Sequence, residues 1–185
     1  MNNNLDEDDS FSRKTLRLKG YDYSQPGAYF VTICTKNKGN LFGRIVSGKI
    51  ILNNLGIIAR RELLHLHNTY SQVKVYDDEY VIMPDHVHTI IWIMDVGATE
   101  PVAQFTASGL QSHSLGSIIG QYKSRVTKKI NQFKTRTISP IWQRNYFERI
   151  IRNQKELLLI KKYITDNPLK WEEWMGSGIL KILKE

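Results

Sequence analysis

The stretch Met83-Pro84-Asp85-His86-Val87-His88-Thr89-Ile90-Ile91-Trp92-Ile93-Met94 decides the fold of this chain. Its apolar second half is typical of a buried β-strand. Side chains alternate along a strand, so His86 and His88 point to one face, about 7 Å apart along the backbone, while Val87 anchors the strand in the core. The two imidazoles can therefore converge on one divalent metal ion. The alternative is that two histidines stand at this spacing by chance on an ordinary strand.

Strand and helix patterns surround this run on both sides. Before the quoted run, the sequence predicts a strand over 28–36, a hairpin over 43–52 that turns at Ser47-Gly48, and a helix that begins at Asn53 or Asn54. It then predicts a strand over 73–83, which Pro84-Asp85 joins to the strand over 86–94. After the quoted run, the sequence predicts a helix that begins at Ser114 and an extended piece over 141–147. A further helix is predicted from Asn153 to about Asp166, and Pro168 ends it. A last helical segment contains Trp171 and Trp174. This mixture favours an α+β sandwich, in which helices pack on one face of a mainly antiparallel sheet.

Length and composition indicate one globular domain. The 185 residues, 41% of them hydrophobic, suffice for a substantial core. We expect residues 1–12 to be a disordered acidic lead and residues 13–185 to form the single domain. The single cysteine, Cys34, cannot form an intramolecular disulfide, and no apolar run reaches the roughly 18 residues of a membrane span. These features predict a cytoplasmic protein without a membrane partner.

The charge distribution predicts a polyanionic partner. The net charge is +8, and no Asp or Glu occurs from Pro101 to Phe147, a window that holds many bases. Such a one-sided block creates a strong local positive field, which attracts nucleic acid. The residues that we expect to contact DNA are Arg13, Arg17, Lys123, Arg125, Lys128 and Arg144. The alternative is a basic face that only contacts solvent.

The helix predicted after Asn153 carries a second candidate group. Ile160 and Ile164 belong to its buried stripe, Tyr163 lies beside that stripe, and Asn167 follows four residues later near the same face. In one interpretation these are a half-buried tyrosine and a helix-ending asparagine. In the other, Asn167 ligates a metal through its amide oxygen, and Tyr163 attacks a phosphodiester. That attack forms a 5′-phosphotyrosine and releases a 3′-hydroxyl, so the strand can be rejoined.

Several segments together resemble one protein family. They are Gly20-Tyr21-Asp22-Tyr23-Ser24, Tyr29-Phe30-Val31-Thr32, Met83-Pro84-Asp85-His86-Val87-His88, Leu115-Gly116-Ser117-Ile118-Ile119 with Tyr122-Lys123-Ser124, Ile141-Trp142-Gln143-Arg144-Asn145-Tyr146-Phe147-Glu148 and Tyr163-Ile164-Thr165-Asp166-Asn167-Pro168. In this order, over about residues 13–170, they resemble the REP-associated tyrosine transposases, a branch of the single-tyrosine HUH transposases of bacterial insertion sequences.

The resemblance implies a fold, a chemistry and a set of residues. It implies a ferredoxin-like α+β domain, Mg²⁺ or Mn²⁺ as cofactor, and cleavage and rejoining of single-stranded or hairpin DNA by a monomer or homodimer. By position, His86, His88 and Asn167 would be the metal ligands and Tyr163 the nucleophile. One residue departs from the pattern, because Arg149 stands where many relatives have histidine after the equivalent of Glu148. We expect Glu148 to be a structural ion-pair partner.

Two other functions remain open from the sequence. A non-catalytic nucleic-acid-binding protein could retain this fold, although the intact set of His86, His88, Tyr163 and Asn167 argues against it. A metal-dependent nuclease that activates water would form no covalent intermediate. Tyr146 is a competing nucleophile in a matching segment, but aromatic packing between Trp142 and Phe147 suffices to explain it.

Overall fold

A computed structural model gives the fold of residues 18, 20–37, 39–95, 113–133 and 140–182, with the backbone alone for 174–182. The elements, in chain order, are β1 (Gly27–Cys34), β2 (Gly43–Val46), β3 (Lys49–Leu52), α1 (Asn54–Leu64), a 3₁₀ turn (His65–Asn68), β4 (Val73–Lys74), β5 (Tyr80–Ile82), β6 (His86–Ile93), α2 (Leu115–Phe133), β7 (Phe147–Ile151) and α3 (Gln154–Ile182). The expected α+β sandwich with a mainly antiparallel sheet is confirmed.

The main sheet has the strand order β4-β6-β1-β7, and β5 pairs with β6 beside β4. All of these pairs are antiparallel. β4 and β5 pair with successive parts of β6 and together take the place of one strand. Counted in this way, and without the β2–β3 hairpin and α3, the chain order is βαββαβ, which is the ferredoxin-like connectivity. β6 is the strand predicted from the quoted run. It lies at the centre of the sheet, and its residues are buried except for Trp92.

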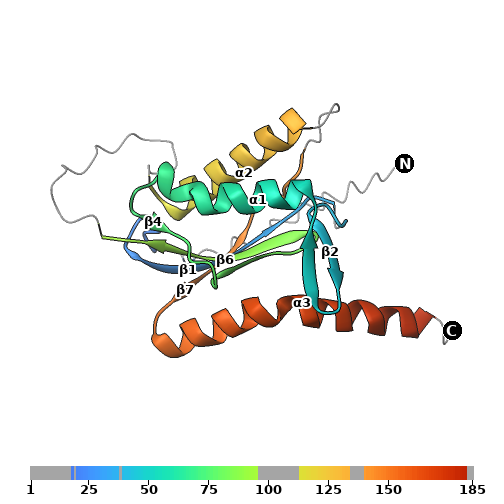
Figure 1. Cartoon of the computed structure of the whole chain (residues 1–185). Helices are drawn as coiled ribbons and strands as arrows, with labels where there is room; N and C mark the ends of the chain where they lie inside the picture. Colours follow the sequence, from blue (N-terminus) through green and yellow to red (C-terminus); the bar gives the residue numbers. More distant parts are fainter. Residues whose placement is uncertain (1–17, 19, 38, 96–112, 134–139, 183–185) are drawn as a thin grey trace, which may run out of the picture.

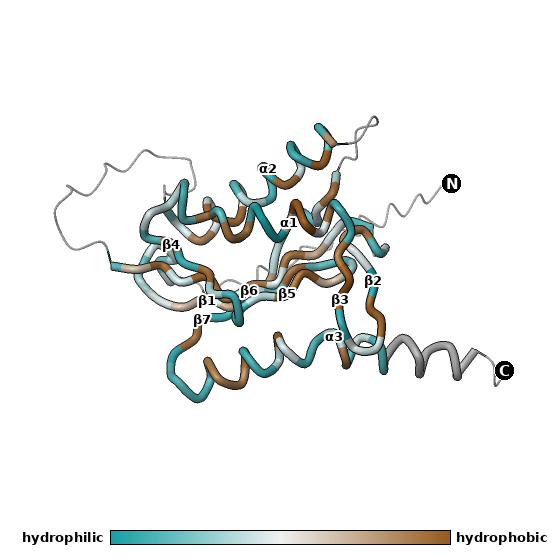
Figure 2. Tube along the Cα trace, viewed as in Figure 1, coloured by the Kyte–Doolittle hydropathy of each residue, from teal (hydrophilic) through white to brown (hydrophobic). Residues whose placement is uncertain are grey.

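Helices cover both faces of the sheet (Figure 1). α1 and α2 lie on one face and bury a large apolar cluster with alternate residues of β1 and β6, among them Val31, Val87 and Ile91. The hydropathy of α2 alternates along its length as expected of a helix with one buried side (Figure 2). α3 lies on the opposite face, where Ile160 and Ile164 contact a second cluster. The expected packing of helices on one face is therefore true of α1 and α2 and wrong for α3.

Local signals in the sequence define several element boundaries. The strand predicted over 73–83 is instead divided into β4 and β5, and β7 begins where the predicted extended piece ends. The Asn53 side chain accepts hydrogen bonds from two backbone amides at the start of α1, at 2.9 and 3.0 Å. The hairpin turns at Ser47 and Gly48, both of which have positive φ. The side chain of Asn153 accepts from the Glu156 amide at 2.9 Å, so the predicted start of α3 is also confirmed.

The predicted end of α3 at Pro168 is wrong, because the helix continues through this proline. Proline cannot donate the helical hydrogen bond, at a cost of about 3 kcal/mol. Tertiary contacts beyond Pro168 offset that cost. Trp171 packs against the second apolar cluster, and the Glu172 carboxylate accepts from the backbone amides of Ser47 and Gly48 at 3.1 and 2.5 Å. The β2–β3 hairpin, which reaches down to α3 in Figure 1, thus contacts the helix just beyond Pro168.

Some expectations fall outside the described residues. They include the acidic lead over 1–12 and the basic residues Arg13 and Arg17. Among the helices that the structure does describe, none combines the length and the apolar character that crossing a bilayer requires.

Candidate active site

The two histidines of β6 meet on the α3 face of the sheet. The His86 and His88 rings lie 4.4 Å apart between centroids, and their Nε2 atoms are 3.0 Å apart. Both residues are buried, with 9% and 5% of their surface exposed. The prediction that they share one face, with Val87 in the core behind them, is confirmed.

A neighbouring side chain contacts the Nδ1 atom of each histidine. Asp85 Oδ1 lies 2.6 Å from His86 Nδ1, and Thr32 Oγ1 lies 2.8 Å from His88 Nδ1. Thr32 is paired directly with His88 across β1 and β6. Hydrogen bonds of this kind fix the orientation of an imidazole and the nitrogen that carries its proton. Both Nε2 atoms are therefore directed toward the same point.

The environment keeps His88 uncharged. Burial, with a smaller contribution from the neighbouring His86, lowers the pKa of His88 to about 3. A neutral imidazole retains a lone pair, which is the form that binds metal ions.

Tyr163 reaches this pair from α3, on the strand-facing side of the helix. Its hydroxyl is 3.4 Å from His88 Nε2, and its ring centroid is 5.2 Å from that of His88. Phe30 contacts both rings, at 5.4 Å from His88 and 5.9 Å from Tyr163. Tyr163 is 40% exposed, so the hydroxyl lies between the buried histidines and solvent. The Lys170 ammonium, 5.8 Å from the Tyr163 ring centroid, adds a positive charge beside it.

These residues fit a divalent metal ion. Two neighbouring ligands of an octahedral ion, each about 2.1 Å from it, are about 3.0 Å apart, and the two Nε2 atoms have this separation. Within the described ranges no three side chains of His, Cys, Asp and Glu form a metal-binding group. Asn167, the third ligand expected from the sequence, is buried at 7% and lies one helical turn after Tyr163. Of the two expected cations, Mn²⁺ accepts nitrogen ligands more readily than Mg²⁺.

Tyr146, the competing tyrosine, lies elsewhere. It packs against the apolar cluster on the α1 and α2 face, and Lys123 Nζ is 5.7 Å from its ring centroid. Glu148 pairs with Val31 in the sheet and is 6% exposed, and its expected ion pair stays a prediction. Arg149, the residue that departs from the family pattern, is exposed and forms an ion pair with Glu156 at the start of α3. Its side chain therefore contributes to the placement of this helix.

Two of the expected DNA-binding residues already have partners within the protein. Lys123 Nζ donates to the three successive backbone carbonyls of residues 143–145, at 2.9, 3.3 and 3.1 Å, and burial lowers its pKa to about 8. Arg125 donates to the carboxylate of Glu62 at 2.8 Å and to Thr69 Oγ1 at 2.8 Å. Glu62 is only 2% exposed, and its other ion-pair partner, Arg61, is farther away at 3.8 Å, so Arg125 is the closer partner of this buried carboxylate. The contacts of Lys123 and Arg125 indicate a structural role, and DNA binding by them stays a prediction.

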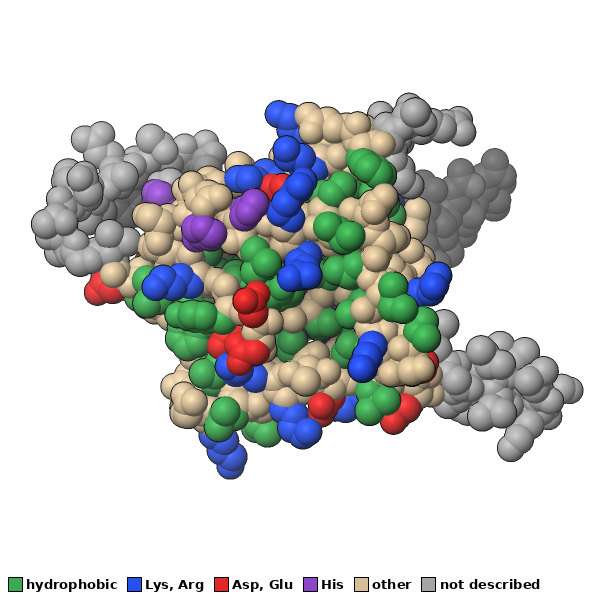
Figure 3. Space-filling view, viewed as in Figure 1, with side chains coloured by type: hydrophobic (Ala, Val, Ile, Leu, Met, Phe, Trp, Pro, Cys, Tyr) green, Lys and Arg blue, Asp and Glu red, His purple; other side chains and the backbone are tan. Residues whose placement is uncertain are grey.

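Lys128 and Arg144 are the expected basic residues that remain exposed in the structure. They line opposite sides of a groove of about 480 Å³ between α2 and residues 140–144. The groove borders the sheet, because the Gln143 amide donates to the Cys34 carbonyl at 2.9 Å and Cys34 pairs with His86. Gln143 lies beside β1, and β1 lies beside β6, which carries the two histidines. Gln143 is therefore two strand spacings, or about 10 Å, from β6. On the face drawn in Figure 3, further Lys and Arg side chains lie over both helical layers.

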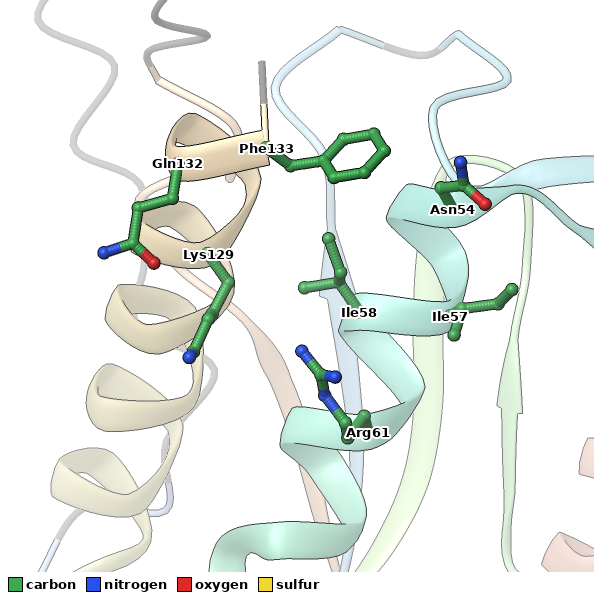
Figure 4. A pocket seen from close by; sticks show the side chains of 7 residues that line it. All are labelled: Asn54, Ile57, Ile58, Arg61, Lys129, Gln132 and Phe133. Atoms are coloured by element: carbon green, nitrogen blue, oxygen red, sulfur yellow. The ribbon is translucent and has the colours of Figure 1, made fainter.

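A second groove, of about 410 Å³, lies between α1 and α2 (Figure 4). Phe133 reaches across from α2, while Ile58 and Arg61 point into the gap from α1. The helices that form it cover the sheet face opposite to α3. This groove is therefore separate from the histidine pair, and none of its lining residues joins the candidate site.

Sequence reasoning missed the residues that support the histidines. Asp85 stands next to His86 in the quoted run, so its role could have been inferred from adjacency. Thr32 and Phe30 lie more than fifty residues away, and only the pairing of β1 with β6 brings them to the site. Trp171, whose ring centroid is 5.5 Å from that of His86, was predicted only as part of a closing helix.

Comparisons with known proteins agree with this architecture. No protein-family model matches the chain. Its fold is similar to that of a REP-associated tyrosine transposase bound to a REP hairpin, with a TM-score of 0.57 and 19% identity over 83% of this chain and 73% of that one. At this level of identity, the likeness shows a shared fold. An uncharacterized protein of Haemophilus influenzae is 40% identical over 167 residues, which cover 87% of this chain and 91% of that protein. The chain therefore belongs to the same family as this Haemophilus influenzae protein.

Proposed function

We propose that this protein is a metal-dependent tyrosine transposase or endonuclease that cleaves and rejoins single-stranded or hairpin DNA. The observation that carries the proposal is the convergence of three groups: the two Nε2 atoms lie 3.0 Å apart, and the Tyr163 hydroxyl lies 3.4 Å from one of them. The solved structure with the similar fold is a transposase bound to a DNA hairpin, which supports DNA as the substrate.

In the proposed reaction Tyr163 is the nucleophile. Its oxygen forms a bond to phosphorus as the phenolic proton leaves, the bond from phosphorus to the 3′ oxygen breaks, and that oxygen takes up a proton. A 3′-hydroxyl and a 5′-phosphotyrosine result, and the reverse attack rejoins the strand. A divalent cation held by His86, His88 and Asn167 would polarise the phosphate as a Lewis acid.

The site also positions the reactants. Tyr163 and Asn167 stand on one helix, so the nucleophile and a ligand keep a fixed separation, which favours an aligned attack. A DNA strand held at Lys128 and Arg144 would have to pass around the sheet to reach the histidines, because α2 covers the sheet face opposite to α3. Lys170 beside Tyr163 would stabilise the negative charge of the phosphate.

One incubation separates this function from its two rivals. The full chain is mixed with a labelled single-stranded DNA hairpin and Mn²⁺ or Mg²⁺, and the products are separated on a denaturing gel. We expect a covalent protein–DNA species together with a released 3′-hydroxyl fragment. Cleavage without the covalent species would indicate a nuclease that uses water. Intact DNA on the denaturing gel, together with a shifted band on a native gel of the same mixture, would indicate a non-catalytic module.

DNA binding should depend on salt through the exposed bases of the α2 groove. Replacing Lys128 and Arg144 together by glutamine should lower the slope of log affinity against log salt by up to about two units, since each lost phosphate contact removes roughly one. The matched control replaces Lys49 and Lys74, which are exposed on β3 and β4 and remove the same charge. A slope that falls equally in both double variants would place the DNA away from this groove.

A further inference from the structure

A buried carboxylate joins the strand of the two histidines to the helix of Tyr163. Glu79 lies just before β5 and is buried. Its backbone carbonyl accepts from the Ile90 amide of β6 at 2.8 Å, and its Oε2 atom accepts from Trp92 Nε1, on the same strand, at 2.5 Å. The other carboxylate oxygen, Oε1, lies 3.4 Å from Nζ of Lys161 on α3. Glu79 is therefore fixed to β6 and presents a negative charge to α3.

Lys161 contacts a second acidic residue as well. Its Nζ atom lies 2.6 Å from Asp78 Oδ2, and this hydrogen bond raises the pKa of Lys161, so the ammonium is charged at neutral pH. Asp78 is largely exposed, and ion pairs on the surface contribute little because water screens them. Glu79 is buried, where screening is weaker. The contact with Glu79 is therefore the one that ties α3 to the interior of the sheet.

Lys161 and Tyr163 lie on opposite flanks of the buried stripe of α3. Successive helical residues are rotated by about 100°, so these two are about 200° apart. The apolar stripe that contacts the second cluster lies between them. One flank of the helix thus meets Glu79 beside β5. The other flank meets the histidine pair, where the Tyr163 hydroxyl lies 3.4 Å from His88 Nε2.

A tie at Lys161 restricts the rotation of α3 about its axis. Apolar burial is non-directional, so the stripe alone leaves this rotation weakly defined. At the helix surface, about 5–6 Å from the axis, a rotation of about 10° displaces a side chain by about 1 Å. Glu156 and Glu172 also bond to segments outside α3, but they lie about 10 and 14 Å along the axis from Tyr163. Lys161 is only about 3 Å from Tyr163 along the axis, so its contacts act locally.

We propose that Glu79 and Lys161 are positioning residues, which fix the rotation of α3 and thereby hold the Tyr163 hydroxyl at the histidine pair. Both act through Tyr163, and neither contacts the reacting atoms. The proposal rests on the proposed function for the chemistry of Tyr163, whereas the position of the Tyr163 ring can be measured without any reaction.

Nuclear Overhauser effects measure this position in the full-length protein. The rings of Tyr163 and Phe30 are 5.9 Å apart between centroids and meet edge to face, so their ring protons are close. Lys161→Met keeps the aliphatic stem and removes the charge. A displacement of about 1 Å should then weaken the effect at least about threefold, because it falls with the sixth power of the distance. Lys161→Arg should retain the effect. The matched control is Lys162→Met, because Lys162 is exposed and pairs with Asp166 of the same helix at 3.0 Å.

The same variants separate positioning from DNA binding. With labelled hairpin DNA at saturation, Lys161→Met should form the adduct about 10- to 100-fold more slowly, because an error of about 1 Å at the nucleophile is costly. Its affinity for DNA should stay within about threefold of that of Lys162→Met, which loses the same charge. Lys161→Arg should react within about threefold of the unmodified rate, since the charge is kept.

A double variant tests whether Glu79 and Lys161 act through one contact. Glu79→Gln keeps an oxygen that can accept from Trp92 and removes the charge that faces Lys161. It should slow adduct formation, and its combination with Lys161→Met should be no slower than Lys161→Met alone, because both changes break the same contact. Rate losses that multiply in the double variant would contradict this. Thermal unfolding confirms that each variant is folded.

The outcomes separate this proposal from the proposed function. An Overhauser effect that is equally strong in Lys161→Met and the unmodified protein would overturn the proposal, whatever the activity. A weakened effect with an unchanged rate would also overturn it, because the rotation of α3 would then be irrelevant to the reaction. If the unmodified protein formed no adduct but the ring contacts responded as expected, the proposed function would fail, and Glu79 and Lys161 would still be the residues that place Tyr163.

Discussion

Tyr163→Phe should eliminate the covalent protein–DNA species and reduce cleavage by at least about a thousandfold. The substitution removes one oxygen, which in the proposed reaction forms the bond to phosphorus. That oxygen has a single described hydrogen-bond contact, at 3.4 Å to His88, and the side chain is 40% exposed. Folding stability should therefore change by less than about 0.5 kcal/mol, and affinity for DNA should be retained. Denaturing gels measure the adduct, and thermal unfolding measures the stability.

Tyr146→Phe is the matched control for this variant. Tyr146 packs on the opposite face of the sheet, near Lys123. The adduct should remain detectable when its hydroxyl is removed. If the adduct instead survived in Tyr163→Phe and disappeared in Tyr146→Phe, Tyr146 would be the nucleophile and the helix α3 would have another role.

His86→Ala and His88→Ala should each reduce cleavage by about a hundredfold or more, because each removes a ligand of the proposed metal site. Chelator should have the same effect on the unmodified protein, reversed by Mg²⁺ or Mn²⁺. Both rings are buried, and His88 stacks on Phe30, so these variants should also lose about 1–3 kcal/mol of stability. Activity is measured at a temperature well below the unfolding midpoint of each variant.

His67→Ala is the matched control, because it removes a histidine that lies outside the candidate site. His67 lies in the 3₁₀ turn after α1 and is exposed. Its replacement should leave cleavage and metal affinity unchanged. Full activity of the His86→Ala variant, or of the unmodified protein in chelator, would refute the role of a metal.

The sequence predicted the local parts of this fold because their signals are local. Apolar runs marked β1 and β6, Asn53 and Asn153 marked helix starts, and Ser47-Gly48 marked a tight turn. The alternation of side chains along a strand was enough to place His86 and His88 on one face. Each of these inferences depends on backbone geometry over a few residues, which is why it holds without knowledge of the rest of the molecule.

Signals that depend on distant contacts were the ones that failed. Pro168 is a helix stop by local rules, yet Trp171 and Glu172 keep α3 continuous by contacts with segments far along the chain. The basic block correctly showed a concentration of charge, but composition could not reveal that Lys123 and Arg125 bond inside the protein. Composition gives the number of basic residues, but only the folded structure shows which of their side chains are bound to other groups of the protein.

By itself, the sequence determined which residues could carry out the proposed chemistry: a same-face histidine pair, and a tyrosine with an asparagine one helical turn away. Only the tertiary structure decided that these two groups meet. It does so by packing α3 on the face of the sheet to which His86 and His88 point, so that the Tyr163 hydroxyl comes within 3.4 Å of His88. It also decided that Thr32 supports His88, through strand register. Alternation and helical spacing are properties of short segments, whereas the choice of face and the register of distant strands depend on burying the whole core at once.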